Sequence, residues 1–389
     1  MRLFWPKEPF DVALSNLQAT RLNRPFADEV LAFTQSLSKR FVRMRHLPEV
    51  VALGYWLRKA NVKQMQAEFE VATTGKMVRA RGLTFHIAPS NVDTIFVYSW
   101  MLSLLAGNSN VIRISSKTEV NVMLQVILEE LPNFEAVATK TIICTYGHEE
   151  KATELLSQAC HTRVIWGGDE TVQAIRNVPL APLANELAFS DRFSLAVLNS
   201  DVVRTLDEQA MDTLLEQFYN DVFWFDQMAC SSPRLVIWVG KPNEAFWQRF
   251  EDKVREKQYE LLAATQVLKY TKSLQLSVEN YVEAVASTTY FSRVQLLDVP
   301  ANVREQHCGG GLFYEYEVDS LAQVAQVVID KDQTIAYFGF EQAALLAFAE
   351  QIVTRGIDRI VPIGQALDFN GVWDGQSFLT SFTREIVIK

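Results

Sequence analysis

The chain has 389 residues, of which 49% are hydrophobic and 21% charged, with only 16 Gly and 12 Pro. This composition excludes a disordered, collagen-like or low-complexity protein, and the length predicts about two to three domains. The formal net charge of −9 argues against non-specific nucleic-acid binding, which needs many cations facing phosphates.

The charge is unevenly distributed along the chain. Residues 1–81 carry 14 Lys/Arg and 7 Asp/Glu, whereas residues 82–389 carry 23 and 39. Apolar residues recur at three and four spacing from Pro25 to Ala80, which predicts a helical N-terminal region. Within it Lys39, Arg40 and Arg43 recur at about one helical turn, and Arg45 follows. This cationic stretch is either a solvated helix face or a docking face for an acidic partner.

The cysteines and the hydropathy of the chain indicate in which compartment we expect the protein. The four cysteines show no paired short spacing, so neither a disulfide framework nor a zinc site is indicated, and we expect no metal. The opening decapeptide lacks an apolar core of signal-peptide length, and the run from Ile95 to Ala106 is too short to span a bilayer. We therefore expect a soluble cytoplasmic protein with free thiols.

After Arg81 short apolar runs alternate with amphipathic segments, which predicts an α/β fold with a largely parallel sheet. The first predicted elements are a strand, a turn, a helix and a second strand: 83–88, 89–93, 94–106 and 110–114. Helix 118–131 and the buried strands 141–145 and 163–166 follow.

A second α/β region begins near Ser194. Its predicted strands are 194–198, 235–239, 311–316 and 334–340, and its predicted helices are 207–221, 243–265 and 341–355. We expect a first domain over residues 1–193 and a second over 194–361. The tail, 362–389, would close a cleft or an interface.

Cys230 lies between the predicted end of an amphipathic helix and a buried strand, among small polar residues and before Pro233. Such a junction suits a thiolate nucleophile, which forms covalent acyl intermediates. A buried structural cysteine is the alternative interpretation, and the more common one for any lone cysteine.

Two turns at predicted strand ends are further candidates. Asn91, in Ala88-Pro-Ser-Asn-Val-Asp93, offers an amide donor at the edge where α/β folds bind ligands, although helix capping also explains it. Gly167 and Gly168, in Trp166-Gly-Gly-Asp-Glu170, precede a helix whose first amides suit a phosphate. A tight turn is the simpler explanation of the two glycines.

The order and spacing of these stretches resemble the aldehyde dehydrogenase superfamily. The motifs that carry the resemblance are the PSN turn, LLAGNSNVIRIS, VIWGGDE and FDQMACSSPR. The last two are most similar to acyl-CoA reductases of the bacterial bioluminescence (LuxC) type, which reduce long-chain acyl thioesters to aldehydes. The resemblance spans roughly residues 80–389. It implies an aldehyde-dehydrogenase-like fold with a Rossmann-type cofactor domain and an α/β catalytic domain.

The resemblance implies that Cys230 is the nucleophile and that Asn91 forms an oxyanion hole with the backbone N–H of Cys230. It places Arg113 against the adenosine ribose of the cofactor, where a cation, helped by Ser116 or Lys117, suits the 2′-phosphate of NADPH.

The same resemblance implies that Gly167, Gly168 and Asp169 border the cofactor pyrophosphate. The acidic Asp169 fits there only if its side chain points away from the phosphates.

Several segments depart from the superfamily pattern or have no clear role. Glu186-Leu-Ala-Phe replaces the ELGG-like segment that carries a water-activating glutamate, so we do not expect Glu186 to be that base. Gly309-Gly-Gly311 replaces a loop that supplies a glutamate to the nicotinamide ribose. Gly364 to Ala366, Trp373 to Gly375 and Thr383-Arg384 also resemble the LuxC type.

The leading hypothesis is NADPH-dependent reduction of a long-chain acyl thioester, from acyl-CoA or acyl carrier protein, through acyl-Cys230. Alternatives are a cysteine acyltransferase or thioesterase, an aldehyde dehydrogenase that oxidises an aldehyde, and a silent scaffold. No His lies close to Cys230 in the sequence, which weakens a Cys–His hydrolase. A homo-oligomer is compatible with the superfamily.

Overall fold

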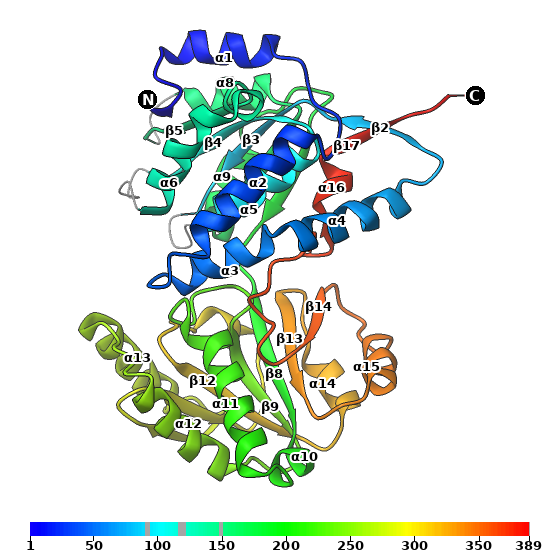
Figure 1. Cartoon of the computed structure of the whole chain (residues 1–389). Helices are drawn as coiled ribbons and strands as arrows, with labels where there is room; N and C mark the ends of the chain where they lie inside the picture. Colours follow the sequence, from blue (N-terminus) through cyan, green and yellow to red (C-terminus); the bar gives the residue numbers. More distant parts are fainter. Residues whose placement is uncertain (90–93, 116–121, 148–150, 389) are drawn as a thin grey trace. The chain divides into compact units, whose positions relative to one another are not determined.

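The computed structural model describes residues 1–89, 94–115, 122–147 and 151–388 (Figure 1). They divide into two compact units, unit 1 (Met1–Ser190 and Phe369–Lys389) and unit 2 (Asp191–Asp368). Each unit has a sheet of its own, covered by helices on both faces.

The sheet of unit 1 has six strands in the order β1-β5-β4-β3-β6-β7, all parallel except the edge strand β1. The chain runs outward from β3 through β4 to β5 and then returns to β6 and β7 on the other side of β3. The order therefore reverses between β3 and β6, and in open α/β sheets ligands bind at the carboxyl ends of the strands at such a point. The strands are β1 (Arg2–Trp5), β3 (Leu83–Ile87), β4 (Ser109–Arg113), β5 (Thr141–Thr145), β6 (Thr162–Trp166) and β7 (Asn185–Phe189).

Helix α5 is apolar all round and is buried along its whole length, as such a sequence requires. With α2, α3, α4 and α6 it forms the core on one face of the sheet, whereas α1, α8 and α9 form the core on the other face. The helices are α1 (Phe10–Ala19), α2 (Asp28–Phe41), α3 (Pro48–Trp56), α4 (Lys59–Ala72), α5 (Thr94–Leu105), α6 (Val122–Glu130), α7 (Glu135–Ala138), α8 (Ala152–Ala159) and α9 (Asp169–Arg176), with a 3₁₀ turn at Leu131–Asn133.

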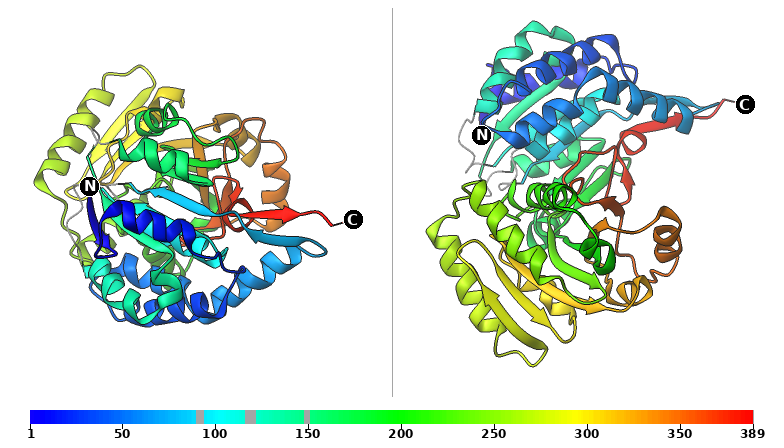
Figure 2. Two further views of the ribbon diagram at one scale, coloured as in Figure 1. Left: turned by 90° about the horizontal axis from the view of Figure 1, so that it is seen from above. Right: turned by 60° about the horizontal axis from the view of Figure 1, so that its bottom comes forward.

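The C-terminal segment completes unit 1. Trp373, Phe378 and Phe382 lie in the core beside α5, and β17 pairs antiparallel with β2, as Figure 2 shows for the red and light-blue strands. This two-stranded ribbon explains Thr383-Arg384 as strand residues, a role that the sequence pattern does not reveal. The elements are β2 (Met77–Ala80), β15 (Val372–Trp373), β16 (Gln376–Ser377), α16 (Phe378–Ser381) and β17 (Thr383–Ile386).

The sheet of unit 2 has seven strands in the order β10-β11-β12-β9-β8-β13-β14, and only β10 is antiparallel to its neighbour. Strands β8 and β9 are continuous apolar runs because both of their faces are covered. The strands are β8 (Phe193–Asn199), β9 (Pro233–Val239), β10 (Val282–Ser287), β11 (Ser292–Leu296), β12 (Leu312–Val318), β13 (Asp332–Phe338) and β14 (Arg359–Pro362).

Two helical layers cover this sheet. Side chains of α11 and α12 form the core on one face, and those of α13, α14 and α15 contribute to the core on the other. The helices are α10 (Ser200–Arg204), α11 (Glu208–Phe223), α12 (Glu244–Glu256), α13 (Ala263–Leu276), α14 (Leu321–Val327) and α15 (Gln342–Ala349), with a 3₁₀ turn at Ala301–Glu305.

The α/β fold with parallel sheets is confirmed, and three helix predictions are corrected. The predicted helix over 243–265 is two helices, because Gln258 adopts a left-handed conformation with φ 53° between α12 and α13. The helical stretch to Ala80 includes the strand β2, and the helix predicted to reach Arg355 ends at Ala349. No helix among the described residues has the length and apolarity that a membrane span requires.

Candidate active site

The carboxyl ends of β3, β4 and β6 bring several predicted cofactor residues to one edge of unit 1. Arg113 is the last residue of β4 and pairs in register with Ile87 of β3 and Cys144 of β5. Its guanidinium lies over the ring of Tyr146, 5.5 Å from the ring centre, and Nη2 donates to the Tyr146 carbonyl oxygen at 3.4 Å. Arg113 is therefore a positioned, half-buried cation beside the point where the strand order reverses.

The glycine turn follows β6 at the same edge. The backbone N–H of Gly167 donates to the carbonyl of Phe189, and Gly168 is the N-cap of α9. A Cβ on Gly167 would contact Thr171 at 3.0 Å, whereas one on Gly168 would meet no atom within 4 Å. Gly168 therefore leaves open space at the start of α9. Asp169 lies in the exposed first turn of this helix, where its negative charge would repel a phosphate.

Three buried polar side-chain atoms at this edge have no hydrogen-bond partner within the described ranges. They are Oγ1 of Thr94 at the start of α5, Oγ1 of Thr145 at the end of β5 and Nε1 of Trp166 at the end of β6. Buried polar groups normally have partners, so groups without one need an explanation. Together with Arg113 and the open turn at Gly168, they fit a polar, anionic cofactor at this edge.

Three predicted site residues lie outside the described residues. They are Asn91, Ser116 and Lys117.

In unit 2, Cys230 lies in the loop between α11 and β9 and is partly buried. The loop starts with two non-glycine residues in the left-handed region, Asp226 with φ 51° and Gln227 with φ 61°. Such conformations are unfavourable for residues with a Cβ and persist only where surrounding contacts fix them. Here the backbone N–H groups of Gln227 and Met228 donate to the carbonyls of Val222 and Phe225, both at 2.7 Å.

The backbone carbonyls of Cys230 and of the two residues before it also accept hydrogen bonds. Oγ of Ser194, on β8, donates to the carbonyl oxygen of Cys230 at 2.6 Å and accepts the N–H of Thr334 on β13 at 3.2 Å. The buried Arg234 donates to the carbonyls of Met228 and Ala229, both at 3.4 Å. The loop is therefore tied to three strands of the sheet, β8, β9 and β13.

The Gly309-Gly-Gly311 loop lies against the Cys230 loop. All three glycines have positive φ, and a Cβ on Gly309 would clash with Sδ of Met228. The N–H of Gly310 donates to the carbonyl of Asp226 at 2.8 Å, and that of Gly311 donates to Oε1 of Gln227 at 2.9 Å. Glycine is required here both for the left-handed backbone and for the close approach. This loop thus supports the Cys230 loop.

His307 lies two residues before the glycine loop, and both of its ring nitrogens are engaged in hydrogen bonds. Its Nδ1 accepts the N–H of Gly309 at 3.0 Å, so its Nε2 donates to the carbonyl of Leu312 at 2.8 Å. Burial, and then the Arg234 charge, hold the pKa of His307 well below its ordinary value. Both ring nitrogens are used structurally, which argues against a Cys230–His307 hydrolase pair.

Glu186 is held in an ion-pair network on β7. Its carboxylate accepts from Nε of the buried Arg163 at 2.8 Å and from Nε of Arg176 at 2.9 Å. Both carboxylate oxygens of Glu186 are thus held by guanidinium groups. This geometry agrees with the expectation that Glu186 is not a water-activating base.

The four cations of the stretch from Lys39 to Arg45 lie in different surroundings in the structure. Helix α2 ends at Phe41, so Arg43 and Arg45 lie beyond it, and both are exposed. Arg40 instead pairs with Glu129 at 2.5 Å and Glu130 at 3.2 Å on α6, so its charge is neutralised within the molecule.

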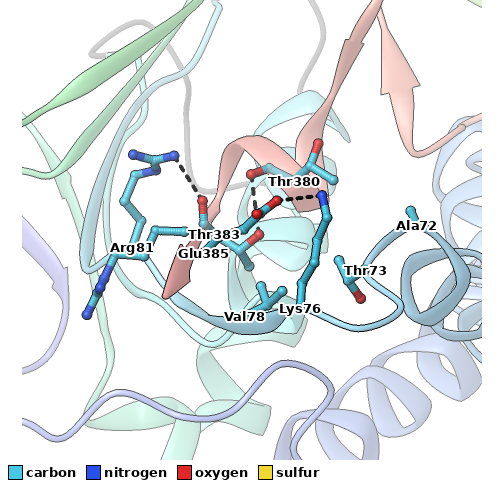
Figure 3. A pocket seen from close by; sticks show the side chains of 9 residues that line it. Ala72, Thr73, Lys76, Val78, Arg81, Thr380, Thr383 and Glu385 are labelled. Atoms are coloured by element: carbon cyan, nitrogen blue, oxygen red, sulfur yellow. Dashed lines mark hydrogen bonds and ion pairs between the residues drawn. The ribbon is translucent and has the colours of Figure 1, made fainter. Parts of the chain in front are cut away.

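A polar pocket of about 250 Å³ lies beside the ribbon of β2 and β17 (Figure 3). Lys76 pairs with Glu385 at 2.7 Å across its mouth, and Nη2 of Arg81 donates to the carbonyl of Thr383 at 2.9 Å. These bonds join the residues that flank β2 to β17 and involve none of the predicted site residues.

No group of His, Cys, Asp and Glu in the described part of the chain is arranged to hold a metal ion. The four cysteines, all of them within it, form no disulfide.

Comparison with known proteins identifies the family. The family model for acyl-CoA reductase (LuxC) matches residues 63–288, more than half of the chain. The chain belongs to the acyl-CoA reductase (LuxC) family. It is therefore an oxidoreductase of a family named for acyl-CoA reduction. In a sequence comparison, no curated protein matches this chain.

Solved structures establish the fold of this acyl-CoA reductase family member. Aldehyde dehydrogenase 21 of Physcomitrella patens, in complex with succinate, has a TM-score of 0.70 at 12% identity over 97% of this chain and 90% of its own. Glyceraldehyde-3-phosphate dehydrogenase of Methanocaldococcus jannaschii, complexed with NADP, has a TM-score of 0.68 at 10% identity over 97% and 92%. The predicted aldehyde-dehydrogenase-like fold is confirmed.

Sequence reasoning missed three residues that shape the Cys230 loop: Ser194, Gln227 and Arg234. Ser194 is 36 residues from Cys230, and the Gln227–Gly311 bond spans 84 residues. No local pattern marks such contacts. Only the placement of a polar residue in or beside an apolar strand gives a hint for Ser194 and Arg234.

Proposed function

We propose that this chain reduces a long-chain acyl thioester to an aldehyde with NADPH, through an acyl group carried on Cys230. The observation that carries the proposal is the loop of Cys230, whose backbone is tied to β8, β9 and the glycine loop while Cys230 itself is only partly buried. Membership of the acyl-CoA reductase family supports the thioester substrate. A fixed backbone around a thiol favours one attack geometry, as covalent catalysis requires.

In the first half-reaction, the Cys230 thiolate attacks the carbonyl carbon of the thioester. The tetrahedral intermediate collapses with loss of the CoA or carrier-protein thiolate, which takes up a proton, and a new thioester forms on Sγ of Cys230. We propose that the backbone N–H of Cys230 and the amide of Asn91 donate to the oxyanion. Each well-placed donor of this kind lowers the barrier by about 3 kcal/mol.

In the second half-reaction a bound nicotinamide supplies the hydride that reduces the acyl carbon. The thiohemiacetal oxyanion that results on Cys230 is held by the same two donors. Its collapse breaks the C–S bond, releases the aldehyde and returns the thiolate. One acyl thioester, one NADPH and one proton thus give one aldehyde, one thiol and one NADP⁺.

The residues proposed to hold NADPH lie at the carboxyl edge of the sheet of unit 1. We assign Arg113, with Ser116 or Lys117, to the 2′-phosphate, because guanidinium and ammonium groups bind phosphate strongly. Gly167 and Gly168 would border the pyrophosphate at the start of α9. Asp169 is proposed to face away from it, since its charge would otherwise repel the phosphates.

The basic N-terminal region supports a role in recognising the thioester donor. With Arg40 neutralised by α6, we propose that Lys39, Arg43 and Arg45, all exposed, receive the phosphates of CoA or an acidic carrier protein. Such a contact is screened by salt. Reversing Arg43 and Arg45 to Glu should raise the KM for the donor at low salt and leave it unchanged at high salt. Equal KM values at low salt would contradict this assignment.

The decisive test is acylation measured separately from reduction. The wild type, incubated with an acyl-CoA and no NADPH, should gain one acyl mass by intact mass spectrometry, and NADPH should remove that mass and release trapped aldehyde. Cys230→Ala should show neither step, while the matched variant Cys308→Ala should show both.

Each alternative function gives a different result in the same experiment. Hydrolysis of the acyl-enzyme without NADPH would indicate a thioesterase, and transfer to an added thiol or alcohol would indicate an acyltransferase. Oxidation of an aldehyde to a free acid by NADP⁺ would indicate an aldehyde dehydrogenase. Acylation of Cys230→Ala would refute the nucleophile.

A further inference from the structure

The ribbon of β2 and β17 brings like charges together. Arg384 of β17 pairs in register with Arg79 of β2, and residues directly opposite in an antiparallel pair share a face. Arg81 follows two residues after Arg79, and its backbone N–H continues the pairing by donating to the carbonyl of Phe382 at 3.1 Å. Like charges at opposite positions are destabilising. Three arginines in so short a ribbon therefore need an explanation.

No carboxylate in the described part of the chain compensates these arginines. Arg79, Arg81 and Arg384 form no ion pair there, whereas Glu385, the one acidic residue of the two strands, is held by Lys76 at 2.7 Å. Solvent screens the exposed Arg79 and Arg384, but Arg81 is half-buried. Burial, and then the charge of Arg384, lower the pKa of Arg81. An anion beside Arg81 would offset both effects.

Arg81 also has hydrogen-bond donors to spare. Its Nε donates to the carbonyl of Ser381 at 3.0 Å, and its Nη2 donates to the carbonyl of Thr383 at 2.9 Å. A guanidinium has five N–H groups, so these two bonds fix the side chain and leave three N–H groups without a partner within the described ranges. A fixed guanidinium with free N–H groups suits the oxygens of a phosphate.

The polar pocket beside the ribbon offers the space for such a ligand. Its volume is about 250 Å³, and Lys76, Arg81, Arg384 and Glu385 are among its lining residues (Figure 3). Because Lys76 neutralises Glu385, two positive charges of the lining have no carboxylate in the pocket. The threonine hydroxyl groups of the lining donate to backbone carbonyls. The two arginines therefore provide the side-chain donors for a ligand.

We propose that this pocket binds a phosphate group, which the guanidinium groups of Arg81 and Arg384 hold together. A phosphate monoester carries a charge of about −1.5 to −2 at neutral pH, which matches the two cations without a carboxylate. Guanidinium groups bind phosphate oxygens through pairs of parallel hydrogen bonds. A carboxylate ligand would neutralise only one of the two cations, and a nucleic acid would need a longer array of them.

This site is separate from the proposed NADPH site. Strands β3 and β4 are parallel; Arg81 lies two residues before β3 starts, whereas Arg113 is the last residue of β4. The two sets of residues therefore lie at opposite edges of the sheet of unit 1. The five residues of β3, at about 3.3 Å each, separate these edges by roughly 16 Å. The phosphate site thus does not depend on the proposed function.

A phosphate in this pocket would join two distant parts of the chain. Arg81 leads into the central strand β3, and Arg384 belongs to the C-terminal strand β17. A ligand that binds the native state and not the unfolded chain stabilises the native state by mass action. We therefore expect phosphate to raise the melting temperature of the protein.

The test measures the binding of inorganic phosphate to the full-length chain by isothermal titration calorimetry. We expect one site per chain with a dissociation constant below about 1 mM. Arg384→Gln changes an exposed residue, so the variant should fold, and it should bind phosphate about ten to a hundred times more weakly because a charged hydrogen bond is lost. The matched control, Arg21→Gln, removes an exposed cation of the same unit and should bind as the wild type does.

The cofactor site is tested in the same titration. Phosphate should bind with the same affinity in the presence and absence of saturating NADPH, and Arg113→Ala should bind it as the wild type does. Displacement of phosphate by NADPH, or loss of binding in Arg113→Ala, would assign the phosphate to the cofactor site and overturn the proposal. Wild-type affinity in Arg384→Gln would also overturn it.

Two further ligands define the chemistry of the site. Sodium acetate at the same ionic strength should neither bind nor raise the melting temperature, and an effect equal to that of phosphate would refute a phosphate site. Glycerol 3-phosphate distinguishes the two sources of a phosphate group. Tighter binding than inorganic phosphate would assign the site to a phosphate monoester, and weaker binding would assign it to the free ion.

Discussion

The side chain of Gln227 accepts a hydrogen bond from the backbone N–H of Gly311 and donates one to the carbonyl of Pro233, both at 2.9 Å. Gln227 is completely buried, so both bonds lie away from solvent. One amide thus joins the loop that carries Cys230 to the glycine loop before β12 and to the start of β9. The position of the thiol depends on this amide as well as on the backbone of its own loop.

Replacing Gln227 should therefore disturb the thiol and the fold together. Gln227→Leu leaves the Gly311 N–H and the Pro233 carbonyl buried without partners, and each such group costs about 1–3 kcal/mol. We expect a lower denaturant midpoint and slower acylation of Cys230, measured by intact mass. Gln209→Leu changes an exposed glutamine on α11 and should alter neither quantity. Acylation of Gln227→Leu at the wild-type rate would contradict the positioning role.

Two serines near Cys230 should respond in opposite ways. Ser194→Ala removes both the donor to the Cys230 carbonyl and the acceptor for Thr334, so we expect about 1–2 kcal/mol less stability and a lower kcat. Oγ of Ser232 is buried without a hydrogen-bond partner among the described residues, so Ser232→Ala should leave stability unchanged or raise it. Chemical denaturation of both variants measures the contrast, and equal losses would refute it.

The sequence predicts those elements whose pattern reflects local burial. Strands such as β8 and β9 are apolar throughout because helices cover both faces, and α5 is apolar because it is enclosed. The sequence does not predict β10, in which four of the six residues are exposed, or the break at Gln258, where neither Gly nor Pro marks the left-handed residue. An element that is stabilised by a neighbour rather than by its own periodicity leaves no local pattern.

The candidate site likewise contains some residues that the sequence predicts and others that it does not. Cys230 is recognisable from the residues on either side of it, and Arg113 from its place at the end of a buried strand. The supporting contacts of Gln227, Ser194 and Glu186 join segments 23 to 84 residues apart. Such partners become visible only when the register of the strands is known, because the register decides which residues face each other.

Arg113 should determine the preference between the two nicotinamide cofactors. If its guanidinium contacts the 2′-phosphate, Arg113→Ala removes a charged hydrogen bond of about 1.5–3 kcal/mol, which corresponds to a KM for NADPH roughly ten to a hundred times higher. The KM for NADH, which lacks that phosphate, should change little. Arg79→Ala removes an exposed cation of the same unit and serves as the control. Equal increases for both cofactors would assign Arg113 a structural role.

Glu186 should matter for stability and not for chemistry. Glu186→Gln leaves the buried Arg163 without its carboxylate, and breaking a buried ion pair costs about 3–5 kcal/mol. The kcat per folded molecule should remain within about threefold of the wild-type value. Loss of a catalytic acid or base would instead lower kcat by about 100-fold or more. Steady-state rates, corrected for the folded fraction, measure this. A folded variant with a 100-fold lower kcat would show instead that Glu186 takes part in catalysis.

Asp221 should make the stability of unit 2 depend on pH. Its buried carboxylate accepts the N–H groups of Gly364, at 2.6 Å, and Ala366, at 3.0 Å, and so holds the segment that follows β14. Burial raises the pKa of Asp221 from 3.8 to about 7, although these two bonds and the charge of Arg359 favour the ionised form. Asp368 lies nearby and adds to the increase.

The sign of the effect follows from the raised pKa. Between about pH 4 and pH 7 the native state keeps a proton on Asp221 that the unfolded chain has lost. The contribution of Asp221 is therefore fully present below pH 4 and is lost as the pH rises to about 7, at up to about 1.4 kcal/mol per pH unit. Asp221→Asn has no charge to titrate, so the stability difference between wild type and variant should fall across this window and be constant above it. Urea unfolding from pH 4.5 to pH 8 measures that difference, with the exposed Asp319→Asn as a control. A difference that rose with pH would mean that the pKa of Asp221 is lowered in the native state.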